Sequence, residues 1–388
     1  MTETLTAPQD IQQLRSYEIS WLADVLTPAL AIYEDFLDIN IAATLKLLHN
    51  RPERWRPHIK TAKLRSTVAR LVAHGITSLK CATTLELLVA IEAGATDILV
   101  AYPCIGSRAR RVLQIQAANP AIPISALIDD AAQLPVWRDS QVGLFIDVDP
   151  GMKRTGIDQQ RIEEIVSLAK RIKQQENRFR GLHYYEGQHR NSDLEQRKLA
   201  AFGGYRQLLE IVEELCRNGL DVEEVITSGT PALPCALAFL DFKKGVFKHT
   251  VSPGTVLYND ITSLSQVPSA WGYRAAALVV TTVVSHPSSD TVTCDAGHKA
   301  LACDAGVPNC SVLGRPELEP LHPSEEHLPL RIREGANRPQ VGDVLYLIPR
   351  HVCPTINNFD DALLIRDARI RAVASVSARG REAPLLGS

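Results

Sequence analysis

A strand-like apolar segment followed by a helical one recurs about eight times between residues 28 and 240, and this alternation constrains the fold more than any other feature. It is typical of βα units, in which helices connect parallel strands. Eight units can close a (β/α)8 barrel, which commonly takes about 250 residues. The predicted strands are residues 29–33, 58–60, 78–82, 97–101, 123–128, 142–148, 180–184 and 225–228.

An open, doubly wound α/β sheet is the alternative, because a strand count from one sequence can be wrong by one or two. No glycine fingerprint of the GxGxxG type follows the first predicted strand. Such a fingerprint would hold the pyrophosphate of a dinucleotide. The sequence therefore disfavours a dinucleotide site and favours the TIM-type barrel.

The pattern changes after Asp260, where β-branched and apolar stretches alternate with Gly, Pro and Ser and show little helical periodicity. Such stretches are typical of short strands separated by turns. We therefore predict a (β/α)8 barrel over residues 27–262. A second, mostly β domain is expected over residues 263–388 together with 1–26, where the first residues add a strand.

Composition limits the possible partners. Apolar residues make up 45% of the chain and the formal charge is −2, so no basic face for nucleic acid is expected. No apolar run approaches the roughly 20 residues that span a bilayer, and the polar N-terminus lacks the order of a signal peptide. Eight cysteines lie scattered without CxxC pairs. We expect a cytoplasmic protein that acts on small molecules, with neither nucleic acid nor membrane as partner.

A lysine lies where the second predicted strand ends, in the stretch Arg56-Pro57-His58-Ile59-Lys60-Thr61-Ala62-Lys63. Active sites of barrel enzymes are built where strands end. Lys60 is therefore a candidate covalent anchor for an aldehyde cofactor. The alternative is a solvated surface charge, which is what most lysines are.

Two glycine-bearing turns could hold a phosphate group. Ser228-Gly229-Thr230 follows the last predicted barrel strand, and Gly254-Thr255 lies in a second such turn. Barrel enzymes commonly bind phosphate in the loops after the seventh and eighth strands. Backbone N–H groups and hydroxyls can surround a dianion there, although Ser-Gly-Thr is also ordinary turn chemistry.

Other polar residues follow predicted strands or occur near the C-terminus. Arg154, in a turn after residues 142–148, could face a cofactor oxygen, and His189 follows residues 180–184. His351 and Cys353 lie two apart, so in an extended segment both could bind one divalent metal ion. A thiolate favours zinc, whereas surrounding oxygen ligands would favour manganese or magnesium.

Together these motifs resemble the D-serine dehydratase and D-threonine aldolase group of pyridoxal-phosphate enzymes, which have the alanine racemase-type fold, fold type III. RPHIKTAK is similar to the family's lysine motif, DPGMKRTG to its arginine segment, YEGQH to its tyrosine motif, SGT and PGT to its phosphate turns, and HVCPTIN to its metal motif. The resemblance covers residues 28–361.

The resemblance implies a role for each matching residue. Lys60 would carry pyridoxal 5'-phosphate as a Schiff base, and Arg154 and Tyr185 would lie beside it. The two turns would bind its phosphate, and His351 and Cys353 would hold the metal. The substrate would be a D-3-hydroxy amino acid, and the enzyme would be a homodimer.

Family members differ at the metal motif, since dehydratases pair His with Cys and aldolases usually pair His with Asp. Cys353 therefore favours a dehydratase that releases ammonia and a 2-keto acid. In this interpretation Lys60 removes the Cα proton and the metal carries away the 3-hydroxyl. Ala62 and Gln188 stand where relatives usually have His, so the role of His189 as a base is open.

Three other functions remain. A D-threonine aldolase-like enzyme would give glycine and an aldehyde, with a base such as His189 taking the hydroxyl proton. A non-catalytic pyridoxal-phosphate-binding protein would need neither a β domain nor a His-x-Cys pair. An amino acid racemase would need two opposed bases and no metal, so it is the least favoured.

Overall fold

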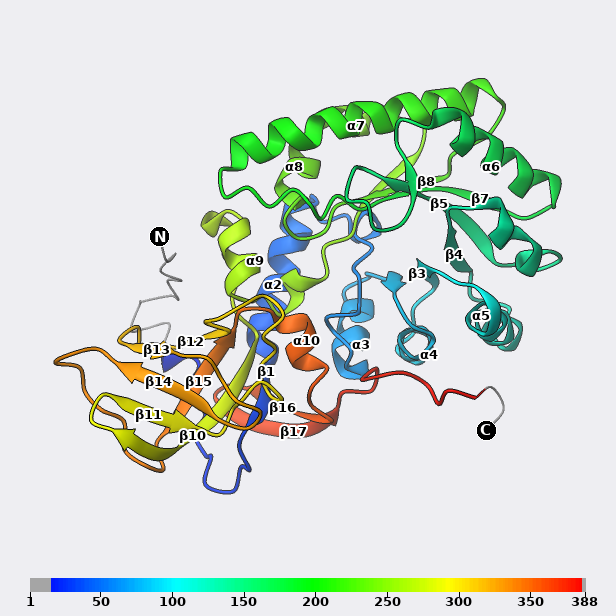
Figure 1. Cartoon of the computed structure of the whole chain (residues 1–388). Coiled ribbons are helices and arrows are strands. Elements are labelled where there is room, and N and C mark those ends of the chain that lie inside the picture. Colours follow the sequence, from blue (N-terminus) through cyan, green and yellow to red (C-terminus); the bar gives the residue numbers. More distant parts are fainter. Residues whose placement is uncertain (1–14, 386–388) are drawn as a thin grey trace. The chain divides into compact units, whose positions relative to one another are not determined.

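The computed structural model describes residues 15–385, which form two compact units (Figure 1). The barrel unit comprises residues 45–60, 65–254 and 380–385. The β unit comprises residues 15–44, 61–64 and 255–379. The domain boundaries predicted from the sequence, 27–262 and 263–388, stay a prediction.

The barrel unit contains a parallel sheet whose strands pair in the order in which they follow along the chain. The last strand has no counterpart among the predicted ones. The sheet comprises β2 (Ser78–Cys81), β3 (Asp97–Pro103), β4 (Ile124–Ile128), β5 (Gly143–Asp149), β7 (Phe179–Tyr184), β8 (Glu224–Thr227) and β9 (Lys248–Val251), with the short β6 (Ile157–Asp158) paired to β5.

The segment that leads to Lys60 joins the two edges of this sheet. Trp55 forms a parallel bridge to Val251 of β9, and His58 forms one to Lys80 of β2. The Arg56 N–H donates to the Val251 carbonyl at 2.9 Å. Residues 55–58 thus serve as the first of eight parallel segments, so the predicted barrel is confirmed.

Helices between the strands pack against one another in chain order, as expected for the outer layer of such a barrel. Their N-terminal caps are readable in the sequence, as in α7, where Asp193 accepts hydrogen bonds from two backbone N–H groups. The helices are α3 (Arg65–Ala73), α4 (Thr84–Glu92), α5 (Gly106–Ala118), η2 (Ala131–Trp137), α6 (Ile162–Gln174), α7 (Leu194–Arg217) and α8 (Leu233–Ala238).

Side chains that alternate along the strands stack in layers. A buried apolar layer consists of Leu99, Leu127, Phe145 and Ile226, from four different strands. Two residues earlier on β3 and β8 lie Asp97 and Glu224, which belong to an ionic layer. Two residues later on β5 lies the buried Asp147, in a polar layer nearer the carboxyl ends of the strands.

The ionic layer is centred on Arg56, whose side chain is fully buried. Its guanidinium contacts Asp97 Oδ2 at 2.6 Å and Glu224 Oε2 at 2.8 Å. Arg180 also contacts Asp97, at 3.0 Å. Arg56 therefore connects the first barrel segment to β3 and β8.

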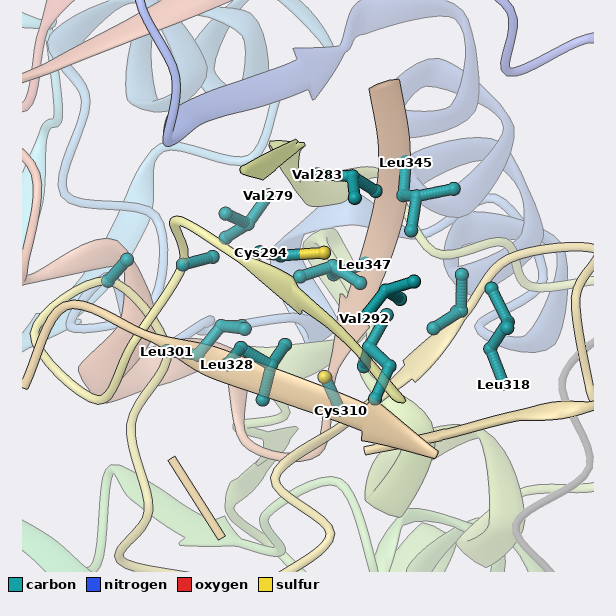
Figure 2. Packing of buried hydrophobic residues seen from close by; sticks show 14 of the residues in the cluster. Val279, Val283, Val292, Cys294, Leu301, Cys310, Leu318, Leu328, Leu345 and Leu347 are labelled. Atoms are coloured by element: carbon teal, nitrogen blue, oxygen red, sulfur yellow. The ribbon is translucent and has the colours of Figure 1, made fainter. Parts of the chain in front are cut away.

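The β unit is built on a mixed sheet in the order β13-β14-β11-β10-β1-β16-β17, with β12 and β15 paired beside β10. Its strands are β1 (Ala29–Tyr33), β10 (Ala277–Ser288), β11 (Thr291–Cys294), β12 (Cys310–Val312), β13 (Leu318–Pro320), β14 (Leu328–Ile332), β15 (Val344–Pro349), β16 (Asp361–Arg366) and β17 (Arg369–Ser375). Figure 2 shows the apolar core between these strands, in which Val279, Val292, Leu328 and Leu347 are fully buried.

One predicted barrel strand is wrong. Ala29–Tyr33 pairs with β10 and β16 in the β unit and not with the barrel sheet. An apolar run predicts a buried strand but does not identify its partner. The expected strand in residues 1–26 falls partly on residues 1–14, outside the described part, and residues 15–26 form no strand.

Within residues 15–385, no helix combines the length and apolar character that crossing a bilayer requires.

Candidate active site

Lys60 is exposed and lies in the turn that follows the first barrel segment. Its backbone N–H donates to His58 Nδ1 at 3.3 Å. Burial, and then the positive charges of Lys60 and Lys80, lower the pKa of His58 well below its usual value. His58 is therefore a neutral imidazole whose Nδ1 can accept the Lys60 backbone N–H.

The turn Ser228-Gly229-Thr230 follows β8, the seventh barrel segment, and not the eighth as the strand prediction implied. Ser228 has a left-handed backbone, with φ of 59°. The hydroxyls of Ser228 and Thr230 are buried and have no hydrogen-bond partner among residues 15–385. Buried hydroxyls without partners cost free energy, so this turn fits a ligand that supplies acceptor oxygens, such as a phosphate.

The second turn follows β9, the eighth segment, and depends on a close backbone approach. A Cβ at Gly254 would lie 2.2 Å from the His58 carbonyl oxygen, so only glycine fits. Ser252 fixes the same region, because its hydroxyl donates to the Arg56 carbonyl at 2.8 Å. Both predicted turns thus lie in the loops where barrels commonly bind phosphate.

Glu186 holds the first turn in place by accepting a hydrogen bond from its backbone. Its fully buried carboxylate accepts the Ser228 N–H at 3.0 Å and the Tyr205 hydroxyl at 2.5 Å. Burial raises the pKa of Glu186 to about 7, although these hydrogen bonds lower it. Glu186 therefore fixes the left-handed Ser228 backbone, which no sequence pattern predicted.

The Tyr185 ring lies close to two glycines and to the Arg154 guanidinium. Cβ atoms at Gly187 and Gly229 would lie 2.5 and 2.8 Å from its ring, so a side chain at either position would displace the ring. The Arg154 guanidinium carbon is 4.8 Å from the ring centroid. Three predicted cofactor residues, Arg154, Tyr185 and Gly229, are therefore brought together.

Asp149 shapes the loop that carries Arg154. Its carboxylate accepts the backbone N–H groups of Gly151, Met152 and Lys153 at 2.7 to 3.1 Å. A carboxylate that accepts three consecutive amides fixes a tight turn. The DPGMKR segment therefore folds around its own first residue.

Lys80, His183 and Asp147, from three barrel strands, form a buried chain of polar contacts. Lys80 Nζ lies 3.1 Å from His183 Nε2, and His183 Nδ1 lies 2.7 Å from Asp147 Oδ1. Asp147 also accepts the Thr155 hydroxyl at 2.8 Å. Since Asp147 must accept, His183 donates from Nδ1 and its Nε2 accepts from Lys80.

Burial and neighbouring charges shift the pKa values of Lys80, His183 and Asp147. Burial, and then the charge of Lys60, lower the pKa of Lys80 to about 7. Burial and the charge of Lys80 also lower the pKa of His183. Burial acts to raise the pKa of Asp147, but the charge and hydrogen bond of His183 lower it overall. The barrel thus contains a second amine, Lys80, that exchanges a proton near neutral pH.

His189 is half-buried, and burial lowers its pKa. Within residues 15–385, no hydrogen bond joins its imidazole to the other predicted site residues. The neighbouring Gln188 donates to the Pro150 carbonyl at 3.1 Å. The role of His189 as a base stays a prediction.

His351 and Cys353 lie in the β unit, where β15 ends and the short helix α10 (Val352–Ile356) begins. His351 Nδ1 is 2.6 Å from Asp304 Oδ2. Although burial lowers it, hydrogen bonds and charges of Cys353 and Asp304 raise the pKa of His351 to about 9. Asp304 thus orients the imidazole through Nδ1, as carboxylates commonly do for metal-binding histidines.

Two contacts fix the backbone of this turn within the β unit. The buried Asp260 accepts the Val352 N–H at 2.9 Å, and Thr262 donates to the Arg350 carbonyl at 2.8 Å. Across residues 15–385, no three His, Cys, Asp or Glu side chains form a ready metal-binding group. The metal site at His351 and Cys353 stays a prediction.

The sequence prediction missed Lys80, His183, Asp147, Glu186 and Asp304. Four of these are charged or titratable residues in or beside apolar strands, and buried charges of this kind are rare unless paired. That signal could have identified Lys80, His183 and Asp147. Asp304 lies in an irregular loop with no comparable signal.

The family model for the alanine racemase N-terminal domain matches residues 32–261, more than half of the chain. The chain belongs to the alanine racemase-type family of pyridoxal-phosphate enzymes. A second model, for a serine dehydratase domain, matches residues 276–365. The resemblance inferred from the motifs is therefore confirmed, and so is the fold-type III architecture.

Individual relatives extend over nearly the whole chain. D-threonine aldolase of Arthrobacter sp. is 27% identical over 368 residues, 92% of this chain and 94% of that protein. D-threo-3-hydroxyaspartate dehydratase of Delftia sp. is 24% identical and covers 85% of this chain and 91% of its own. The crystal structure of D-threonine aldolase from Filomicrobium marinum matches with a TM-score of 0.82 and 25% identity, over 92% and 97% of the two chains.

The residues present fit the family's cofactor. Unpaired buried hydroxyls at Ser228 and Thr230 and the close approach at Gly254 suit the phosphate of pyridoxal phosphate. Lys60 is an exposed amine in the adjoining turn. The individual assignments of Lys60, Arg154, Tyr185, Ser228, Gly229, Thr230, Gly254 and Thr255 stay predictions.

Thr230→Val should weaken cofactor binding about tenfold or more, since a hydrogen bond to a charged group contributes about 1.5–3 kcal/mol. The stability of the cofactor-free protein should not fall, because the Thr230 hydroxyl has no partner to lose. Fluorescence titration and thermal unfolding measure the two effects. Thr227→Val, which loses a hydrogen bond to His249, is the matched control with the opposite pattern. Unchanged cofactor affinity in Thr230→Val would contradict the assignment.

Lys80→Met should change how stability depends on pH. Because the folded-state pKa of Lys80 is about 7 and the unfolded value is about 10.4, unfolding takes up a proton between these values. The free energy of unfolding therefore rises with pH in this window. Relative to the native protein, Lys80→Met should be more stable at pH 7 than at pH 9 by about 2 kcal/mol. Urea unfolding measures this, with the exposed Lys244→Met as control, and a pH-independent difference would refute it.

Proposed function

We propose that this protein is a pyridoxal-phosphate- and metal-dependent lyase that acts on D-3-hydroxy amino acids, as a dehydratase that releases ammonia and a 2-keto acid. The observation that carries the proposal is the pairing of His351 with Cys353 in a chain that also has the family's lysine and phosphate turns. A lysine that binds an aldehyde cofactor would by itself suit many reactions. The added metal pair selects chemistry at a hydroxyl.

Bound pyridoxal phosphate supplies an electron sink for charge that develops at Cα of an amino acid. Lys60 would hold the cofactor through its side-chain amine, which would also serve as the acceptor for the Cα proton of the substrate. Ser228, Thr230 and Gly254 would hold the phosphate, and Arg154 and Tyr185 would contact the ring.

His351 and Cys353 are proposed as ligands of one divalent ion. The thiolate favours zinc, with manganese or magnesium as alternatives. The ion would act as a Lewis acid on the 3-hydroxyl and assist its departure. Solved structures of D-threo-3-hydroxyaspartate dehydratase, 21% identical to this chain, include a cysteine-to-alanine variant in a metal-free form and a histidine-to-alanine variant.

An aldolase is the second candidate, and the 27% identity to a D-threonine aldolase favours it. There a base would take the proton of the 3-hydroxyl and the Cα–Cβ bond would break. His189 is the proposed base for this reaction.

The proposal includes a homodimer in the cytoplasm, with a small-molecule substrate and no nucleic acid or membrane partner.

Product analysis distinguishes the two lyases. The purified holoenzyme is offered D-serine, D-threonine and D-3-hydroxyaspartate, with and without EDTA. Ammonia together with a 2-keto acid is the expected result, and EDTA should abolish its formation. Glycine with an aldehyde would replace the dehydratase by the aldolase, and turnover unaffected by EDTA would refute the metal. Absence of any turnover would favour a cofactor-binding protein.

A further inference from the structure

Two threonine hydroxyls approach the sulfur of Cys353 within the β unit. Thr61 Oγ1 lies 3.0 Å from Cys353 Sγ, and Thr255 Oγ1 lies 3.7 Å from it. Thr61 is fully buried, and Thr255 and Cys353 are half-buried. The sulfur is therefore surrounded by side chains that can donate to it.

The chain positions of these threonines are informative. Thr61 directly follows the anchor lysine Lys60, and Thr255 directly follows Gly254 of the second phosphate turn. Each hydroxyl is thus one peptide bond from a residue assigned to the cofactor. Three motifs far apart in the sequence meet at one thiol.

We propose that Thr61 and Thr255 are positioning residues that donate hydrogen bonds to the Cys353 thiolate and couple metal binding to cofactor binding. The inference rests on the proposed function, because it takes Cys353 as a metal ligand. A thiol that coordinates a metal is deprotonated, so its sulfur can only accept. Both hydroxyls then become donors, and such supporting partners typically change metal affinity 10- to 100-fold.

Coupling between metal binding and cofactor binding follows from the residues that precede Thr61 and Thr255 in the chain, Lys60 and Gly254. Attachment of the cofactor at Lys60 and binding of its phosphate at Gly254 restrict the backbone next to Thr61 and Thr255. A metal that binds afterwards meets hydroxyls already held in place and loses less conformational freedom. By linkage, the metal must strengthen cofactor binding by the same factor.

Asp304 offers a comparison with Thr61, because it contacts the other proposed metal ligand. It fixes the other predicted ligand, His351, at 2.6 Å, but its loop carries no residue assigned to the cofactor. Asp304→Asn should therefore weaken metal binding about equally with and without cofactor. Thr61→Val should weaken metal binding mainly when the cofactor is present.

The test measures Zn²⁺ affinity by competition with a chromophoric chelator, on full-length protein stripped of cofactor and on the same protein reloaded with pyridoxal phosphate. In the native protein the cofactor should strengthen zinc binding about fivefold or more. In Thr61→Val this factor should fall close to one, with zinc about tenfold weaker in the loaded protein. Thr61→Ser, which keeps the hydroxyl, should restore both values.

Thr44→Val is the matched control, since Thr44 is equally buried in the same unit but bonds to Asn40 and Tyr273. It should leave zinc affinity and coupling unchanged. If Thr61→Val does not fold by circular dichroism, the half-buried Thr255→Val gives the comparison at saturating pyridoxal phosphate, because Thr255 is also assigned to the phosphate turn. Native zinc affinity and coupling in the folded threonine variants would overturn the inference.

Different results would refute the His351–Cys353 metal pair and the coupling through Thr61 and Thr255. Zinc binding by Cys353→Ala as tight as in the native protein would refute the metal pair, and with it the proposed function. Loss of zinc in Cys353→Ala, with native behaviour in both Thr61→Val and Thr255→Val, would refute only the coupling.

Discussion

The buried guanidinium of Arg56 is the contact on which the rest of the barrel depends. It donates to Asp97 on β3 and Glu224 on β8, and so holds the first barrel segment in the ring. Removing one partner of such a buried pair commonly costs about 3–5 kcal/mol, because the remaining charges lose their compensation. Lys60, the proposed anchor, lies four residues further on, so this contact also helps to fix its position.

The layers of the barrel separate stability from chemistry. The ionic layer around Arg56 and the apolar layer around Phe145 contain no residue assigned to the cofactor. Above them lie Lys80, His183 and Asp147, buried groups that can move protons between one another. Reactive groups therefore lie on a rigid base, at the end of the barrel where such enzymes act.

Much of this could be predicted from the sequence, because local patterns carry it. The alternation of strands and helices predicted the barrel, and the order of the motifs predicted the family. The error at Ala29–Tyr33 has a physical cause, since hydrophobicity predicts burial and not the pairing partner. Lys80 and His183 meet across the barrel at a sequence distance that no local pattern spans. Contacts such as Thr61 with Cys353 depend on tertiary structure alone.

The proposed cofactor anchor is Lys60, and not the neighbouring buried amine Lys80. Reduction of the holoenzyme with sodium borohydride converts the lysine–cofactor C=N bond into a stable amine, and peptide mass spectrometry then locates it. The label is expected on Lys60 and should be lost in Lys60→Ala. A label on Lys80, on another lysine or on none would contradict the account.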